Sequence, residues 1–139
     1  MAVLFTFEVH TPYRLFYSGQ VEAIVLKLLD GEVAIYANHD HITAPVIPCL
    51  LRIKEKNGNW KTAFTAEGIL EVTSHKTVLI SDAAEWPGEI DYERAKNAKE
   101  HAEKILTEEN HKYETESAAA SLKRANVRIM AYEARDKNS

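Results

Sequence analysis

The residues of this chain best suited to chemistry are arginines and an acid in its last third. Arg94 follows Asp91 by three residues, and Arg124 and Arg128 lie four residues apart further along. Arginine side chains match phosphate oxygens two at a time, so several of them can balance a polyphosphate. Two arginines four residues apart on a helix also repel each other mildly, and an acid or an anionic ligand should compensate them.

Nearby acids offer a simpler explanation for these arginines. The arginines can form ion pairs within the same chain with Glu85, Asp91 and Glu93. Ion pairs of this kind are common on protein surfaces. Asp91 can also act as the N-cap of a helix, where its carboxylate accepts from backbone N–H groups and meets the positive end of the helix dipole. No glycine-rich phosphate loop accompanies the arginines. Internal ion pairs are therefore the commoner explanation, and a phosphate ligand is the alternative.

Other reactive residue types form no convincing site. The segment Asn38-His39-Asp40-His41 contains metal-ligand types, but no cysteine or second ligand cluster nearby can complete a tetrahedral zinc site. Cys49 stands in an apolar run, where a small buried thiol is expected rather than a nucleophile. No Ser/His/Asp or Cys/His arrangement stands out. We expect neither a metal nor a catalytic residue, and a small metal-dependent enzyme using His39 and His41 is a distant third hypothesis.

The composition is that of a folded protein. Of the 139 residues, 45% are hydrophobic and 27% charged, which is ordinary for globular domains. The net charge is −4 and the basic residues are scattered, so the basic stripe of a nucleic-acid binder is missing. No stretch approaches the roughly 18 apolar residues of a membrane helix, and the start does not resemble a signal peptide. We expect an intracellular protein that neither binds nucleic acid nor inserts into a membrane.

The elements that must position these residues change character near residue 86. Before it, short apolar runs predict strands: the run 5–10 alternates apolar and polar residues, while 21–26 and 33–36 should be covered on both faces. The turn signals between strands are Ser18-Gly19, Asp30-Gly31, Asn57-Gly58 and Gly68, with a further turn near 74–76. This spacing predicts an antiparallel sandwich or barrel.

After Trp86-Pro87-Gly88 the hydrophobic period becomes helical. The two predicted stripes are Ile90, Arg94 or Ala95, Ala98, Ala102 and Ile105, then Ala118, Leu122, Ala125, Ile129 and Tyr132, with a polar link at 107–115. Alanine stripes let two helices approach closely but bury little apolar area. The pattern predicts a helical hairpin that is marginally stable alone. Such a hairpin must dock on something or change shape, as in a regulatory subunit.

Four blocks of residues, in order along the chain, resemble the epsilon subunit of bacterial F-type ATP synthase. The blocks are Phe16-Tyr17-Ser18-Gly19, residues 31–39 (Gly-Glu-Val-Ala-Ile-Tyr-Ala-Asn-His), Gly68-Ile69-Leu70-Glu71-Val72 and Ile90-Asp91-Tyr92-Glu93-Arg94-Ala95. The resemblance covers nearly the whole chain. It implies an all-β N-terminal sandwich of about ten strands over residues 1–86 and a C-terminal antiparallel α-helical hairpin over residues 87–139.

The resemblance also implies a regulatory and structural role without catalysis. The family's sandwich grips the gamma subunit and touches the c-ring, which here would place Glu32 and His39 on the ring side. The hairpin lies folded on the sandwich or extends into the alpha/beta catalytic hexamer, where it inhibits ATP hydrolysis. We therefore expect a central-stalk subunit, peripheral to the cytoplasmic face of the cell membrane.

Some bacterial members of the family hold ATP in the folded hairpin. The positions of this chain that match their motif and arginines are Glu85, Asp91, Arg94, Arg124 and Arg128. A further arginine of that set is replaced here by His101, which removes a permanent charge. The resemblance implies ATP as a regulatory ligand and no obligatory cofactor. A free-standing nucleotide-binding regulatory module is the alternative function.

Overall fold

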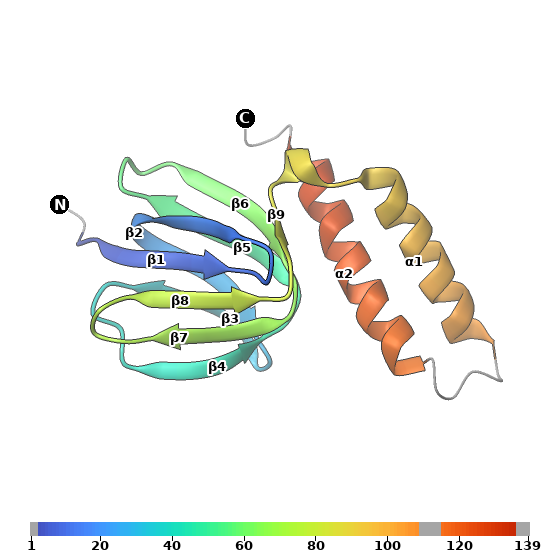
Figure 1. Cartoon of the computed structure of the whole chain (residues 1–139), viewed down its shortest axis with the longest axis horizontal. Helices are drawn as coiled ribbons and strands as arrows, with labels where there is room; N and C mark the ends of the chain where they lie inside the picture. Colours follow the sequence, from blue (N-terminus) through green and yellow to red (C-terminus); the bar gives the residue numbers. More distant parts are fainter. Residues whose placement is uncertain (1–2, 109–114, 136–139) are drawn as a thin grey trace. The chain divides into compact units, whose positions relative to one another are not determined.

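The computed structural model describes residues 3–108 and 115–135, which divide into two compact units with the boundary between Trp86 and Pro87 (Figure 1). The strands of the first unit are β1 (Phe5–His10), β2 (Leu15–Leu28), β3 (Gly31–Tyr36), β4 (Ile42–Val46), β5 (Cys49–Glu55), β6 (Trp60–Thr65), β7 (Gly68–Val72), β8 (Thr77–Ser81) and β9 (Ala84–Glu85). The helices of the second are η1 (Pro87–Glu89), α1 (Tyr92–Thr107) and α2 (Thr115–Ala134). The expected sandwich followed by a two-helix region is confirmed.

The long strand β2 joins the two layers of the sandwich. Its first half pairs with β1, its second half pairs with β3 and β5, and its end reaches β4. One layer continues through β1, β8, β7 and β4, and the other through β5, β6 and β9 (Figure 1). The core between them includes the fully buried side chains of Phe7, Ile24, Leu51, Leu70 and Leu79. The strand pairs are antiparallel, as expected for an antiparallel sandwich, except for β1 and β8, which pair in parallel.

Most of the predicted turns are confirmed, with one clear exception. Gly31 and Gly58 have positive φ angles of 133° and 85°, which glycine adopts readily, and both follow the expected Asp or Asn. Between β7 and β8 the hydroxyl of Thr73 accepts hydrogen bonds from two backbone N–H groups of the expected turn. Ser18-Gly19, however, lies inside β2, opposite Glu8 and Phe7 of β1. The turn expected there is wrong because β2 runs straight through these residues and extends the strand expected at 21–26 back to Leu15.

Burial along the continuous apolar runs differs between two neighbouring strands. Residues 23–26 of β2 are all buried, as expected for a strand covered on both faces. In β3 only Ile35 is buried, and Tyr36 is 62% exposed. Among the described strands β3 pairs only with β2, so it is an edge strand, and its burial pattern shows that one of its faces is open. The expectation of two covered faces is therefore wrong for residues 33–36.

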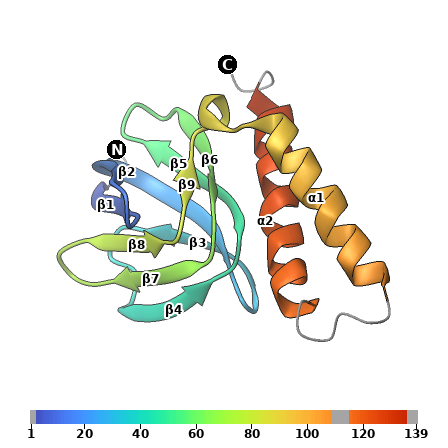
Figure 2. The same cartoon turned by 45° about the vertical axis from the view of Figure 1, so that its right-hand side comes forward.

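The helices α1 and α2 run antiparallel and pack side by side (Figure 2). Their buried residues are Ala95 and Ala102 on α1 and Ala118, Ala125 and Ala131 on α2. Ala98, expected on the buried stripe, is exposed, because the buried alanines of α1 recur at a spacing of seven and form a narrower seam. The expected link at 107–115 falls mostly on 109–114, which lie outside the described residues.

Candidate functional site

Asp91 is the N-cap of α1. Its φ and ψ of −82° and 94° are extended, and its side-chain Oδ1 accepts a hydrogen bond of 3.1 Å from the backbone N–H of Arg94. Its carbonyl oxygen accepts the first intrahelical bond, 3.0 Å, from Ala95. The helix therefore starts where it does because one side chain satisfies an N–H that has no partner within the helix. The N-cap interpretation from the sequence is confirmed.

The other candidate nucleotide contacts lie on three different elements. Arg94 is exposed in the first turn of α1, whereas Arg124 and Arg128 are half-buried and lie one turn apart on α2. Glu85 ends β9 in the sandwich unit. The structure brings Asp91 and Arg94 together through the cap and aligns the two arginines of α2. The assembly of the whole set around a ligand stays a prediction.

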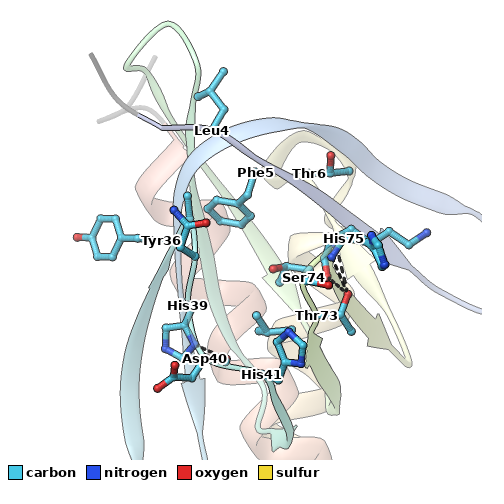
Figure 3. A pocket seen from close by; sticks show the side chains of 15 residues that line it. Leu4, Phe5, Thr6, Tyr36, His39, Asp40, His41, Thr73, Ser74 and His75 are labelled. Atoms are coloured by element: carbon cyan, nitrogen blue, oxygen red, sulfur yellow. Dashed lines mark hydrogen bonds between the residues drawn. The ribbon is translucent and has the colours of Figure 1, made fainter.

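His39, one of the two candidate partner contacts, lines a polar pocket (Figure 3). Ile42, the first residue of β4, is opposite Val72, the last residue of β7, so the loop before β4 and the turn after β7 lie at the same end of these two strands. The resulting cavity has a volume of about 590 Å³. Its polar lining includes His39, His41, Thr73, Ser74, His75 and Lys76. The pairing of β4 with β7 cannot be read from the sequence, so the turn at 73–76 was not predicted to line a pocket with His39.

Hydrogen-bonding groups dominate the chemistry of this pocket. The Nδ1 of His39 lies 2.8 Å from the carbonyl oxygen of Asp40, which fixes the ring beside the opening. The Nζ of Lys76 lies 3.3 Å from Glu8, so its charge is partly balanced. Within residues 3–108 and 115–135, no group of three His, Cys, Asp or Glu side chains is arranged to hold a metal ion. The pocket can receive polar groups of a partner chain.

Glu32 does not line the same pocket as His39. It lies at the start of β3, where its carboxylate is 3.4 Å from the guanidinium of Arg52. The strand residues from Glu32 to Tyr36 span about 13 Å at roughly 3.3 Å per residue, so the two candidates lie toward opposite ends of β3. Contact of both with one partner stays a prediction, and it requires a surface that runs along β3.

Cys49 is a structural thiol. It is 2% exposed, and its Sγ lies 3.7 Å from the hydroxyl of Thr65. Burial raises the pKa of the Cys49 thiol above its ordinary value, which keeps the sulfur protonated and unreactive. The expectation of a buried thiol is confirmed.

The fold and these surfaces define a two-part protein in which a β-sandwich is followed by a helical hairpin with an acid-capped first helix. Two family models match in the same order. Residues 4–87 match the beta-sandwich domain of the ATP synthase delta/epsilon chain, and residues 89–133 match its long alpha-helix domain. The chain belongs to the ATP synthase delta/epsilon chain family.

Individual relatives agree with this assignment. An ATP synthase epsilon chain of Caldicellulosiruptor saccharolyticus is 47% identical over 131 residues, which cover 94% of this chain and 95% of that one. One of Caldanaerobacter subterraneus is 44% identical, with 90% and 91% covered. Among solved structures, a chain of the Euglena gracilis mitochondrial ATP synthase aligns with a TM-score of 0.71 at 16% identity, covering 99% of this chain and 82% of that chain. That structural likeness shows a shared fold. Neither described helix is long and apolar enough to cross a membrane.

Proposed function

We propose that this chain is a central-stalk subunit of an F-type ATP synthase that couples the catalytic head to the c-ring and has no catalytic activity of its own. The observation that best supports this role is the 47% identity to an ATP synthase epsilon chain over 94% of this chain, which includes both units. The hairpin and sandwich are then parts of one rotor component, and catalysis belongs to other subunits.

The sandwich is the part that binds the rotor in this proposal. It holds the gamma subunit and turns the edge with Glu32 and His39 toward the c-ring, at the cytoplasmic face of the membrane and peripheral to it. The polar pocket beside His39 supports this orientation, because it offers several donors and acceptors to a polar loop of a partner. A solved assembly titled central stalk and c-ring, from Tetrahymena thermophila, contains a chain of similar fold with a TM-score of 0.55 at 13% identity.

The hairpin is the regulatory part. Its seam is made of alanines, which bury little apolar area, so a small change in free energy can open it. When extended, it enters the alpha/beta hexamer, blocks rotation and inhibits ATP hydrolysis. When folded, it presents Asp91, Arg94 and the arginines of α2 together.

ATP is the proposed regulatory ligand, and no cofactor is obligatory. ATP binds the folded hairpin through Arg94, Arg124 and Arg128, with Asp91 and Glu85 as further contacts. Because the helices present these groups together only when folded, ATP shifts the population toward the folded hairpin. Falling ATP then releases the inhibitory form.

Co-purification tests the rotor assignment. The full chain is mixed with the gamma subunit of the same organism and separated by size-exclusion chromatography, and we expect a stable stoichiometric complex. A variant carrying Glu32→Ala and His39→Ala should keep gamma and lose affinity for the c-ring, whereas Asp82→Ala, on an exposed residue away from β3, should keep both. Failure of the full chain to bind gamma, combined with ATP binding by the chain alone, would favour the free-standing nucleotide-binding module.

A further inference from the structure

An aromatic stack joins the two helices at the open end of the hairpin. Tyr92 is the first residue of α1, and Tyr132 lies near the end of α2. Their ring centroids are 4.4 Å apart with an angle of 14° between the ring planes. The hydroxyl of Tyr92 also lies 3.5 Å from Oε2 of Glu133. The start of α1 and the end of α2 lie at the same end of the hairpin (Figure 2), and these side chains join them.

A cation lies over each ring of this stack. The guanidinium of Arg135 is 3.7 Å from the centroid of Tyr132, and its Nη1 donates a 2.7 Å hydrogen bond to the carbonyl oxygen of Tyr132. The Nζ of Lys96 lies 5.0 Å from the centroid of Tyr92. Cations over aromatic faces are attracted by the ring quadrupole. Each of these contacts joins residues three or four apart in the sequence, so it holds a ring in position within its own helical segment, whereas the ring stack itself joins α1 to α2. We name Tyr92, Lys96, Tyr132 and Arg135 the aromatic clasp.

The aromatic clasp adds buried apolar area that the alanine seam lacks. An alanine side chain buries little area, whereas each tyrosine can bury about 150–250 Å² and gains a further contribution from the stacked geometry. Both rings are half-buried, so opening the hairpin exposes their covered faces to water. The strength of the clasp therefore sets how often the open end of the hairpin separates.

We propose that the aromatic clasp is the latch that holds the hairpin folded, so that α1 and α2 separate only when the Tyr92–Tyr132 stack breaks. The inference rests on the proposed function only in assigning an inhibitory role to the opened hairpin. Asp91, Tyr92 and Arg94 share the start of α1, so a ligand that orders this turn also positions Tyr92 for stacking. Ligand binding and the clasp then favour the same folded state.

Fluorescence energy transfer on the full chain measures the latch directly. Glu100→Cys on α1 and Met130→Cys on α2 introduce labelling sites at exposed positions outside the clasp, while the native Cys49 is buried. The clasp is removed with Tyr92→Leu and Tyr132→Leu, which keep apolar side chains with good helix propensity. We expect the ratio of open to closed hairpins to rise up to about tenfold, as the loss of one stacked aromatic pair between the helices implies.

Three matched variants keep the test decisive. Tyr132→Phe retains both rings and the contact of the Tyr92 hydroxyl with Glu133, and it should leave the ratio near its original value. Tyr13→Leu, at a residue 89% exposed in the sandwich unit, should change nothing. Arg135→Gln keeps both tyrosines but removes the guanidinium that holds the Tyr132 ring in its stacked position, so it should raise the ratio, by no more than about threefold. This variant serves as the test if the double leucine variant loses helical circular dichroism.

An unchanged ratio in both the leucine and the glutamine variants overturns the latch. A failure of the latch proposal can be told apart from a failure of the proposed function, because inhibition is measured separately as the rate of ATP hydrolysis by the assembled complex. A hairpin that opens in the leucine variant without any change in hydrolysis would confirm the latch and contradict the inhibitory role.

Discussion

Replacing Asp91 separates its role as a helix cap from its proposed role as a ligand contact. In the structure, Oδ1 of Asp91 accepts a 3.1 Å hydrogen bond from the N–H of Arg94. Asp91→Ala removes this acceptor, which typically costs about 1 kcal/mol of helix stability. Asp91→Asn keeps an equally good cap and loses only the interaction of the negative charge with the helix dipole, about 0.3–1 kcal/mol at an exposed site.

Hydrogen exchange of individual amides gives the readout for these two variants. A loss of about 1 kcal/mol corresponds to roughly fivefold faster exchange, and it should be largest at the N–H of Arg94 that loses its partner. The alanine variant should show this increase, and the asparagine variant should show clearly less. Calorimetry with ATP then separates the second role, because weaker binding by the asparagine variant reports the lost charge rather than a frayed helix.

Two outcomes would refute this reasoning. Unchanged exchange at Arg94 in the alanine variant would mean that the Asp91 side chain does not hold the first turn. Equal effects of alanine and asparagine would mean that charge rather than hydrogen bonding stabilises the helix start.

Three further changes test other parts of the account. Gly68→Ala should lower the urea midpoint of the sandwich by an amount equivalent to about 1–3 kcal/mol, because the added Cβ collides with the carbonyl oxygen of Ile80. The control Gly88→Ala adds a Cβ in open space and should leave the midpoint unchanged. Equal midpoints for the two variants would contradict the close approach of β7 and β8. Burial and the hydrogen bond to Glu55 raise the pKa of the Tyr17 hydroxyl. The stability that Tyr17 contributes is therefore fully present below its unfolded pKa of about 10 and is lost as the pH rises beyond that value. Tyr17→Phe should flatten this alkaline loss of stability in pH-dependent unfolding, and an unaltered slope would refute the prediction. Arg128→Ala should weaken ATP binding about tenfold by calorimetry, whereas Arg52→Ala on the sandwich should not, and unchanged affinity would remove Arg128 from the site.

The sequence predicts well where one residue acts on its immediate neighbours. The N-cap role of Asp91 depends only on residues next to it, because its carboxylate accepts from the backbone N–H of Arg94 three residues later, and the structure confirms this cap. The turns with Gly31 and Gly58 follow from the positive φ angles that Asp-Gly and Asn-Gly favour. Local chemistry decides these features, so one sequence is enough.

Features that depend on distant pairing could not be predicted in this way. Ser18-Gly19 has the composition of a turn, but the long pairing of β1 with β2 outweighs that tendency. The pocket beside His39 exists because β4 pairs with β7, and no local signal links those strands. Tyr92 and Tyr132 were placed on separate helices, and their stacking depends on the register of the two helices.

ATP hydrolysis by the assembled complex tests the central claim most directly. A complex that lacks this subunit is reconstituted either with the full chain or with a chain ending at Trp86, the last residue of the compact sandwich unit. Both should bind gamma, and only the full chain should slow hydrolysis, with the inhibition relieved as ATP rises. Equal hydrolysis rates with the two chains would contradict a regulatory hairpin.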